Sequence, residues 1–258
     1  MSRVIDAEKC IGCGKCVSDC INEYLILVDS ENGAKKASFK ERGRCLECGH
    51  CNAICPEDAI SGGKLLDAEA EQDELLGLMA GKRTVRKYIK GKAITEDVLQ
   101  RIIFAGQSAP TDRNRKSARI ILVKEKLPVI YGKALDYLVE EVSKTGTINP
   151  LYSSTMRLDA KRDEILWNAE YMVVFVGSKA NLTDAAIAAE RMQLEAASLG
   201  VGTGYRGDMK TAINNVCELG EILGVKNNEE ALICFAMGLT DVKYLRPAVK
   251  GNRKVEYI

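Results

Sequence analysis

Histidine is almost missing from this chain of 258 residues, in which His50 is the single example. Its scarcity argues against Ser-His-Asp triads, histidine-based metal sites and histidine proton shuttles. Excess charge is missing too, because 37 Lys and Arg residues and 36 Asp and Glu residues leave a net charge of +1, with no block of like charges. This balance argues against a nucleic-acid partner that is recognised through its charge.

Long apolar runs are also absent. The longest, at 171–176 and 231–239, are far shorter than the roughly 18 residues that a membrane-spanning helix needs. The first residues, Met1 to Asp6, lack the apolar core of a secretory signal. We therefore expect a cytoplasmic protein without a membrane partner, in a reducing compartment where clustered cysteines serve as ligands or catalysts more often than as disulfides.

The composition is that of an ordinary globular protein, with 46% apolar and 28% charged residues. The length suits one medium domain together with a small one. Disorder and fibrous architectures are excluded.

Eight of the ten cysteines lie before residue 56, in a spacing that occurs twice. Each set follows the pattern C-x2-C-x2-C-x3-C, and Pro56 follows the second. The first set is Cys10, Cys13, Cys16 and Cys20, and the second is Cys45, Cys48, Cys51 and Cys55. Each cysteine of the first set has its counterpart 35 residues later, as Gly14 has in Gly49. The segment is therefore an internal duplication.

This spacing is typical of [4Fe–4S] clusters. Three thiolates at three-residue intervals can bind one cluster, and in two-cluster proteins the fourth cysteine of each motif binds the other cluster. We expect Cys10, Cys13, Cys16 and Cys55 to hold one [4Fe–4S] cluster and Cys45, Cys48, Cys51 and Cys20 to hold the second. Two alternatives remain less favoured: zinc would leave surplus cysteines, and a disulfide framework needs an oxidising compartment.

Residues 3–62 resemble the bacterial two-cluster ferredoxins. The first motif departs from them by having Ile21 where a proline is usual. The two motifs are also separated by a hairpin-like insert over 23–39, with Asn32-Gly33 as its turn. The insert contains none of the predicted ligands.

A break at Ser61-Gly62-Gly63-Lys64 places the domain boundary at about residue 64, giving domains over 1–64 and 65–258. Beyond it, helical and strand patterns alternate. Helices are expected up to Gly81, from Thr95, and over 128–144, 182–199 and 209–223; strands are expected over 118–123, 171–176 and 232–236. The predicted fold class is α+β, with helices flanking a central mixed sheet.

The run Gly202-Thr203-Gly204-Tyr205-Arg206-Gly207 fits the dinucleotide fingerprint G-x-G-x-x-G. That fingerprint works where it follows a strand and opens a helix. Here it follows a helical pattern over 185–199, so we expect a glycine-rich turn at a helix end and no Rossmann site.

The segment from Lys82 to Tyr88 places four cations within six residues, around Thr84. Such a cluster can bind a phosphate through charge and hydrogen bonds. It is followed in order by the segment 105–114, the run Leu199-Gly200-Val201-Gly202 and a basic tail. In this order the segments resemble the nitroreductase family of FMN-dependent oxidoreductases, over residues 74–258. The whole chain thus resembles ferredoxin–nitroreductase fusions, which form intertwined homodimers with FMN at the subunit interface.

The resemblance implies FMN-binding roles in four places. The opening motif would bind the phosphate, ribityl chain and ring edge; the next loop would reach the partner's flavin; the third would face flavin N5 with a backbone amide; and the tail would complete the phosphate site. The residues are, in that order, Lys82, Arg83, Thr84 and Arg86; Pro110, Thr111, Asp112 and Asn114; Gly204, Tyr205, Arg206 and Gly207; and Lys250 with Arg246. A lid over the flavin is expected within 147–165.

We therefore expect an iron–sulfur flavoprotein oxidoreductase that passes electrons between the clusters and FMN. The resemblance implies an electron-poor small acceptor such as a nitroaromatic or a quinone, and a ferredoxin or NAD(P)H as donor. No catalytic acid or base stands at a convincing spacing. Two alternatives stay open: an electron-transfer or flavin-carrier protein without small-molecule turnover, and an NAD(P)H-dependent enzyme whose clusters are the electron exit.

Overall fold

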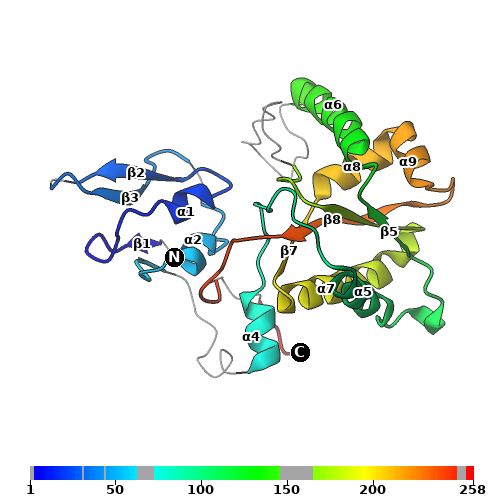
Figure 1. The fold of residues 1–258 in the computed structure, drawn as a ribbon, viewed down its shortest axis with the longest axis horizontal. Helices are drawn as coiled ribbons and strands as arrows, with labels where there is room; N and C mark the ends of the chain where they lie inside the picture. The colour runs from blue at the N-terminus through cyan, green and yellow to red at the C-terminus, as the bar shows by residue number, and fades with distance from the viewer. Residues whose placement is uncertain (1–2, 31, 44, 63–72, 146–164, 249–253) are drawn as a thin grey trace. The chain divides into compact units, whose positions relative to one another are not determined.

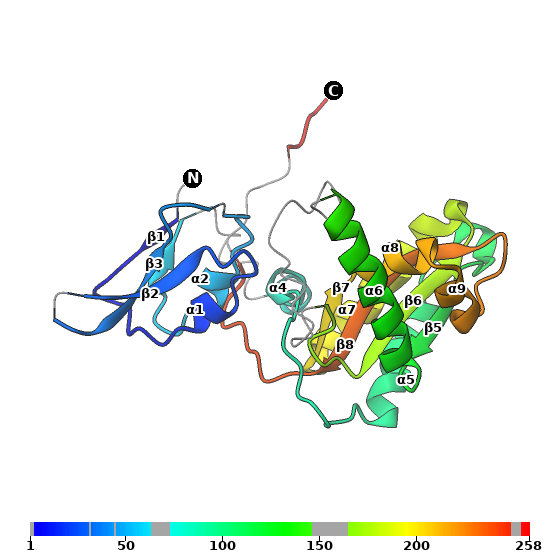
Figure 2. The ribbon, with the colours of Figure 1, turned by 90° about the horizontal axis from the view of Figure 1, so that it is seen from above.

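The computed structural model describes residues 3–30, 32–43, 45–62, 73–145, 165–248 and 254–258. The chain divides into two compact units, drawn in Figures 1 and 2. Unit 1 combines Met1–Arg83 with Lys243–Ile258, and unit 2 is Thr84–Val242. The predicted boundary at about residue 64 lies outside the described residues and stays a prediction. Of the helices described, none is long and apolar enough to cross a membrane.

Unit 1 is built from the two cysteine motifs and the hairpin between them. A short antiparallel pair, β1 and β4, joins the residues before the first cysteine motif to those after the second, and the short helices α1 and α2 follow the first two cysteines of each motif. The bounds are β1 Val4–Ile5, α1 Lys15–Ser18, β2 Leu25–Asp29, β3 Lys35–Phe39, α2 His50–Ile54, β4 Ile60–Ser61 and α4 Glu74–Gly81.

The sequence duplication is also a duplication of backbone conformation. Gly14 precedes α1 with φ 72°, and Gly49 precedes α2 with φ 77°. Both values lie in the left-handed region that glycine adopts without a Cβ clash. Each motif therefore turns into its helix at the same point, between its second and third cysteines.

The insert forms the hairpin predicted from Asn32-Gly33. Strands β2 and β3 pair antiparallel from Leu25 with Phe39 to Asp29 with Lys35. Gly33 has φ 78°, and the amide of Ala34 donates to Asn32 Oδ1 at 3.2 Å. The asparagine side chain thus holds the turn that the following glycine permits.

Unit 2 contains a four-stranded sheet in the order β5-β6-β8-β7 (Figure 1). Its strands are β5 Arg119–Val123, β6 Tyr171–Gly177, β7 Val201–Tyr205 and β8 Glu230–Leu239. Adjacent strands pair antiparallel, and a parallel component comes from an isolated bridge between Thr84 and Thr203. All seven residues of β6 are buried, as the continuous apolar run predicts for a central strand.

Helices cover both faces of this sheet. Figure 1 shows α5 and α7 on one face and α6, α8 and α9 on the other. Their bounds are α5 Glu96–Gln107, α6 Leu127–Thr145, α7 Leu182–Ser198, α8 Gly207–Asn215 and α9 Cys217–Leu223, with single 3-10 turns η1 Asp112–Asn114 and η2 Lys179–Asn181. The single helix expected over 209–223 is divided, because Val216 adopts an extended conformation between α8 and α9. The other predicted helices and strands of unit 2 are confirmed.

The prediction that the run from Gly202 to Gly207 forms a turn is wrong. Helix α7 ends at Ser198, and Gly200 makes the turn with φ 72°. The run that follows is the edge strand β7, which pairs antiparallel with β8. No parallel crossover of the dinucleotide-binding kind begins here, because such a site needs a parallel strand.

The glycines of β7 allow another segment to lie against the strand. A Cβ on Gly202 would lie 2.9 Å from Val85 Cγ1, and a Cβ on Gly204 would lie 2.9 Å from Thr84 Cγ2. The amide of Val85 donates to Thr203 O at 2.8 Å. The two glycines therefore serve the close approach of two backbones rather than a turn.

Among the described glycines of unit 1, Gly12 has the least room for a side chain. A Cβ there would lie 2.1 Å from Lys35 O, a backbone atom of the hairpin. Its φ of 68° is not decisive, since Glu47, its counterpart in the second motif, adopts φ 53° with a full side chain. The clash with the hairpin is therefore what requires glycine at position 12.

This difference predicts the effects of two substitutions. Gly12→Ala should lower the free energy of unfolding of unit 1 by clearly more than the roughly 1–2 kcal/mol that a left-handed L-residue costs, because the hairpin must also move. Gly33→Ala is the control, since its φ is 78° with no atom within 4 Å of the added Cβ. Chemical denaturation, with hydrogen exchange of the hairpin amides, measures both. Equal losses in the two variants would contradict the steric explanation.

Candidate functional site

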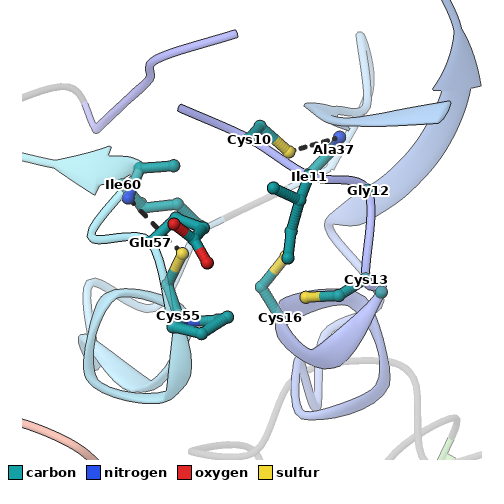
Figure 3. A pocket seen from close by; sticks show the side chains of 12 residues that line it. Cys10, Ile11, Gly12, Cys13, Cys16, Ala37, Cys55, Glu57 and Ile60 are labelled. Carbon is teal, nitrogen blue, oxygen red and sulfur yellow. Dashed lines mark hydrogen bonds between the residues drawn. The ribbon is translucent and has the colours of Figure 1, made fainter. Parts of the chain in front are cut away.

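Four cysteines from both motifs line one cavity of unit 1. Cys10, Cys13 and Cys16 come from the loop before α1 and from α1 itself, and Cys55 follows α2. Figure 3 shows their side chains around a common space. Three cysteines of the first motif thus share a cavity with the last cysteine of the second.

A second cavity has the reciprocal composition. It is lined by Cys45, Cys48 and Cys51 of the second motif and by Cys20 of the first. Arg3, His50, Tyr24 and Phe39 are also among its lining residues. The two cavities therefore divide the eight cysteines into the same two sets that the sequence predicts as ligand sets.

Backbone amides point at sulfur atoms in both cavities. In the first, Ala37 donates to Cys10 Sγ and Ala59 to Cys55 Sγ, both at 3.4 Å. In the second, the amide of Tyr24 donates to Cys20 Sγ and the amide of Glu47 donates to Cys45 Sγ, both at 3.3 Å. Amide donors to the sulfurs are a feature of protein-bound iron–sulfur clusters, so the residues present fit such groups.

The cysteine sets are arranged around cavities rather than around a point. Throughout the parts of the chain that the structure describes, no three His, Cys, Asp or Glu side chains converge closely enough to hold a single metal ion. A multi-atom cluster needs such a space between its ligands, because it lies among the four sulfurs.

Burial keeps two of the thiols protonated in the metal-free protein. Burial and then the neighbouring Cys55, Cys13 and Cys10 raise the pKa of Cys16 to about 11. Burial raises the pKa of Cys51 to about 12, although the charge of Arg3 opposes it. A metal binds the thiolate, so loading of these sites must release protons.

The structure brings two cations to the cysteine loops that the sequence did not indicate. Lys36 Nζ, on the hairpin, donates to Cys10 O at 2.6 Å. Arg3 Nη2 donates to Glu47 O at 3.2 Å, between two cysteines of the second motif. The insert is therefore part of the cysteine sites. The alternation of a hairpin strand predicts which side chains share a face, but not that Lys36 faces a cysteine loop.

In unit 2, the structure brings Thr84 together with Gly204. The Thr84–Thr203 bridge and the Val85 amide attach the second half of the basic motif to β7. The hydroxyl of Tyr88 donates to Val85 O at 3.2 Å and approaches Ala236 O at 3.4 Å. Two of the segments predicted to contact FMN, far apart in the sequence, are thus adjacent.

The side chain of Arg206 is directed into the protein. It is 8% exposed, and its guanidinium donates to Ile165 O and, at 2.8 Å, to Tyr205 O. The same group lies 4.4 Å from the centre of the Trp167 ring. Arg206 therefore stabilises the turn before β6. Its side chain is not available for the predicted flavin contact of this loop, which would have to come from the backbone and from Tyr205. Gly207 is the first residue of α8.

Tyr205 is 42% exposed at the end of β7. Its hydroxyl lies 3.4 Å from Glu190 Oε2. Burial of the hydroxyl and the charge of Glu190 raise the pKa of Tyr205 to about 12, so the phenol is neutral at physiological pH.

The loop after α5 is exposed and tightly turned. Arg113, Asn114 and Lys116 have positive φ values, and Thr111 Oγ1 accepts from the amide of Lys116 at 3.1 Å. Pro110, Asp112 and Asn114 are exposed, and Thr111 is half-buried. The loop therefore lies at the surface of unit 2.

Of the remaining predicted FMN residues, Arg86 is half-buried in unit 2, and the others lie in unit 1 or outside the described residues. Lys82 ends α4, and the guanidinium of Arg83 donates to Ala80 O at 2.6 Å and Lys82 O at 2.7 Å. Burial lowers the pKa of Arg83, and the nearby Tyr244 and Cys48 oppose that shift. Arg246 binds backbone carbonyls of unit 1. Lys250 and the expected lid, apart from Ile165, lie outside the described residues.

Comparison with known proteins identifies both parts of the chain. Residues 9–60 match the 4Fe-4S dicluster domain. An uncharacterised ferredoxin of Methanocaldococcus jannaschii is 42% identical over 57 residues, which are 22% of this chain and 71% of the ferredoxin. The N-terminal segment is therefore a 4Fe–4S ferredoxin domain, as the cysteine spacing predicts.

The larger part of the chain is similar to an oxidoreductase and to a nitroreductase. An NADPH-dependent oxidoreductase of Staphylococcus aureus is 28% identical over 171 residues, 64% of either chain. A nitroreductase from Desulfitobacterium hafniense, solved with bound FMN, superimposes with a TM-score of 0.59 at 23% identity, over 72% of this chain and 98% of its own. The second likeness is one of fold. Residues 79–239 match the nitroreductase family, and the chain therefore belongs to that family and carries a ferredoxin domain in front of it.

Proposed function

We propose that the chain is an iron–sulfur flavoprotein oxidoreductase with two [4Fe–4S] clusters and FMN. Its electron acceptor is an electron-poor small molecule, such as a nitroaromatic or a quinone. The observation that carries the proposal is the pair of four-cysteine cavities in a chain of the nitroreductase family.

The ligand sets follow the cavities. Cys10, Cys13, Cys16 and Cys55 hold one cluster, and Cys45, Cys48, Cys51 and Cys20 hold the other. Two amide donors to the cysteine sulfurs in each cavity support this assignment. Zinc is less suited, because it prefers four ligands around a point.

The FMN site is proposed on the basic motif and β7. Lys82 and Arg86 attract the phosphate by charge, and the hydroxyl of Thr84 adds a hydrogen bond. The backbone from Gly204 to Gly207 faces the ring, because the side chain of Arg206 is turned inward and does not cover it. Arg246 is left out of this proposal, because its guanidinium binds carbonyls in unit 1.

When bound, the clusters supply single electrons and the flavin exchanges two electrons with an acceptor. The chain contributes binding and electrostatics: thiolates for the clusters, cations for the phosphate and a backbone amide for the ring. Tyr205, a neutral phenol beside Glu190, is placed to orient an acceptor through a hydrogen bond. Protons come from solvent.

NADPH is the candidate donor that a specific observation favours, because the Staphylococcus aureus relative is named an NADPH-dependent oxidoreductase. A reduced ferredoxin is the other. Anaerobic mixing with each donor, followed at flavin and cluster wavelengths, decides between them. Reduction by neither would leave a carrier protein as the better description.

Anaerobically purified protein should contain about eight irons and eight labile sulfides per chain, with one flavin. Cys55→Ala should lose one cluster. Because Cys10 is proposed to hold the same cluster, adding Cys10→Ala should remove no further iron, whereas adding Cys45→Ala should remove the second cluster. Iron and sulfide analysis gives the result.

Cys217→Ala is the matched control, since this exposed cysteine on α9 belongs to neither set. It should keep all of its iron. If Cys45→Ala added no loss to Cys55→Ala while Cys10→Ala did, the exchange of ligands between the motifs would be wrong.

Lys82→Ala and Arg86→Ala should each weaken FMN binding by roughly ten- to a hundredfold, because a charge-assisted hydrogen bond contributes about 1.5–3 kcal/mol. Cluster content should not change. Titration of apo-protein with FMN measures the affinity. Lys126→Ala, an exposed lysine between β5 and α6, is the control; Lys124 is unsuitable because it pairs with Glu170 at 2.8 Å. A similar loss in the control would refute the role of the motif.

We further propose a homodimer whose flavin sites need both subunits. The loop at 110–114 projects from α5, and on the same helix Phe104 is 70% exposed. An aromatic side chain with that exposure suits a subunit contact.

Sedimentation should show a dimer, and Phe104→Glu should weaken it and reduce bound FMN, because the charge would be buried in the contact. Gln107→Glu, exposed on the same helix, adds the same charge without removing an apolar side chain and should stay dimeric. FMN bound in full to a stable monomer would contradict the proposal.

A further inference from the structure

Arg246 belongs to the segment that follows β8 and returns to unit 1. Its Nη1 donates to Asn52 O at 2.8 Å and to Cys55 O at 2.6 Å. The side chain is 23% exposed. This partly buried guanidinium therefore binds the end of α2, the helix that contains Cys51 and is followed by Cys55.

The neighbouring residues hold this segment in place. The amide of Leu245 donates to Ala53 O at 2.8 Å. The ring of Tyr244 packs edge-on against His50, with centroids 5.4 Å apart. Arg246 thus occupies a fixed position on α2.

That position is electrostatically significant. Helix α2 carries Cys51 and is followed by Cys55, and these two cysteines line different cavities. A guanidinium is always charged, and here it binds the carbonyl of Cys55, which belongs to one ligand set, and that of Asn52, which directly follows Cys51 of the other set. The counter-charge is weak, because Asp58 Oδ1 is 3.6 Å away but 62% exposed, where water screens it.

Lys36 offers a comparison within the same unit. Its ammonium binds Cys10 O at 2.6 Å, and Cys10 lines the first cavity only. Lys36 therefore places a charge beside a cysteine of one ligand set, whereas Arg246 places a charge beside Cys55 of that set and beside the residue that follows Cys51 of the other.

We propose that Arg246 is a positioning residue whose permanent charge raises the reduction potentials of both clusters, while Lys36 raises that of the first cluster alone. The inference rests on the proposed function, because it needs both clusters to be present. Reduction adds one electron, and thus one negative charge, to a cluster without making or breaking a bond to the protein. A nearby cation stabilises the added charge, so its removal must make reduction harder.

The test is a redox titration of the full chain with dithionite, followed by the electron paramagnetic resonance of each reduced cluster. For Arg246→Gln, the ratio of reduced to oxidised cluster at the wild-type midpoint should fall about tenfold in both steps, equivalent to 59 mV for one electron. Lys36→Gln should move one step and leave the other in place. If the two steps coincide in the wild type, Lys36→Gln should separate them.

Two kinds of control keep the outcome specific to charge. Arg246→Lys retains the charge and should keep both potentials near those of the wild type. Lys243→Gln and Lys35→Gln remove exposed cations next to Arg246 and Lys36 and should change neither step.

Each result decides between distinct conclusions. Intact clusters whose potentials are the same in Arg246→Gln and the wild type would overturn the inference and leave the proposed function standing. Equal shifts in Arg246→Lys and Arg246→Gln would also overturn it, because the effect would then come from geometry. Absence of clusters from the wild type would instead defeat the proposed function itself.

Discussion

Each cavity of unit 1 draws three cysteines from one motif and the fourth from the other, and most of the unit follows from this exchange. Motifs that are 35 residues apart must lie side by side for Cys55 to share a cavity with Cys10 and Cys20 with Cys45. The left-handed glycines before α1 and α2 give both loops the same turn. The hairpin and the pair β1–β4 then close the unit around the two cavities.

The exchange also explains why the sequence was so informative about unit 1. Ligand chemistry restricts residue type and spacing together, so the cysteine pattern predicts the partition of Cys20 and Cys55 without knowledge of the fold. The supporting cations are under no such restriction. Lys36 and Arg246 bind backbone carbonyls of other residues. Because every residue has a carbonyl, no sequence spacing predicts these contacts.

In unit 2 the sequence predicts most of the regular helices and strands but mistakes a glycine-rich strand for a turn. The apolar runs of β6 and β8 and the periodicity of α5 and α7 predict these elements well. The strand β7 was mistaken for a turn, because Gly202 and Gly204 are common in turns. Their role depends on Thr84 and Val85, which lie more than a hundred residues earlier in the sequence. Only the tertiary contact distinguishes a glycine needed for its backbone from one needed for its lack of a side chain.

The division of the chain has a consequence for its synthesis. Unit 1 consists of two stretches, with the whole of unit 2 between them in the sequence. A ribosome therefore completes residues 84–242 before the segment that carries Arg246 is made. Domains generally fold in the order in which they emerge, so the cysteine loops and hairpin can form early, while the contacts of Tyr244, Leu245 and Arg246 with α2 come last. The eight cysteines are thus translated well before the segment that binds α2, and the last contacts of unit 1 form only after unit 2 has been made.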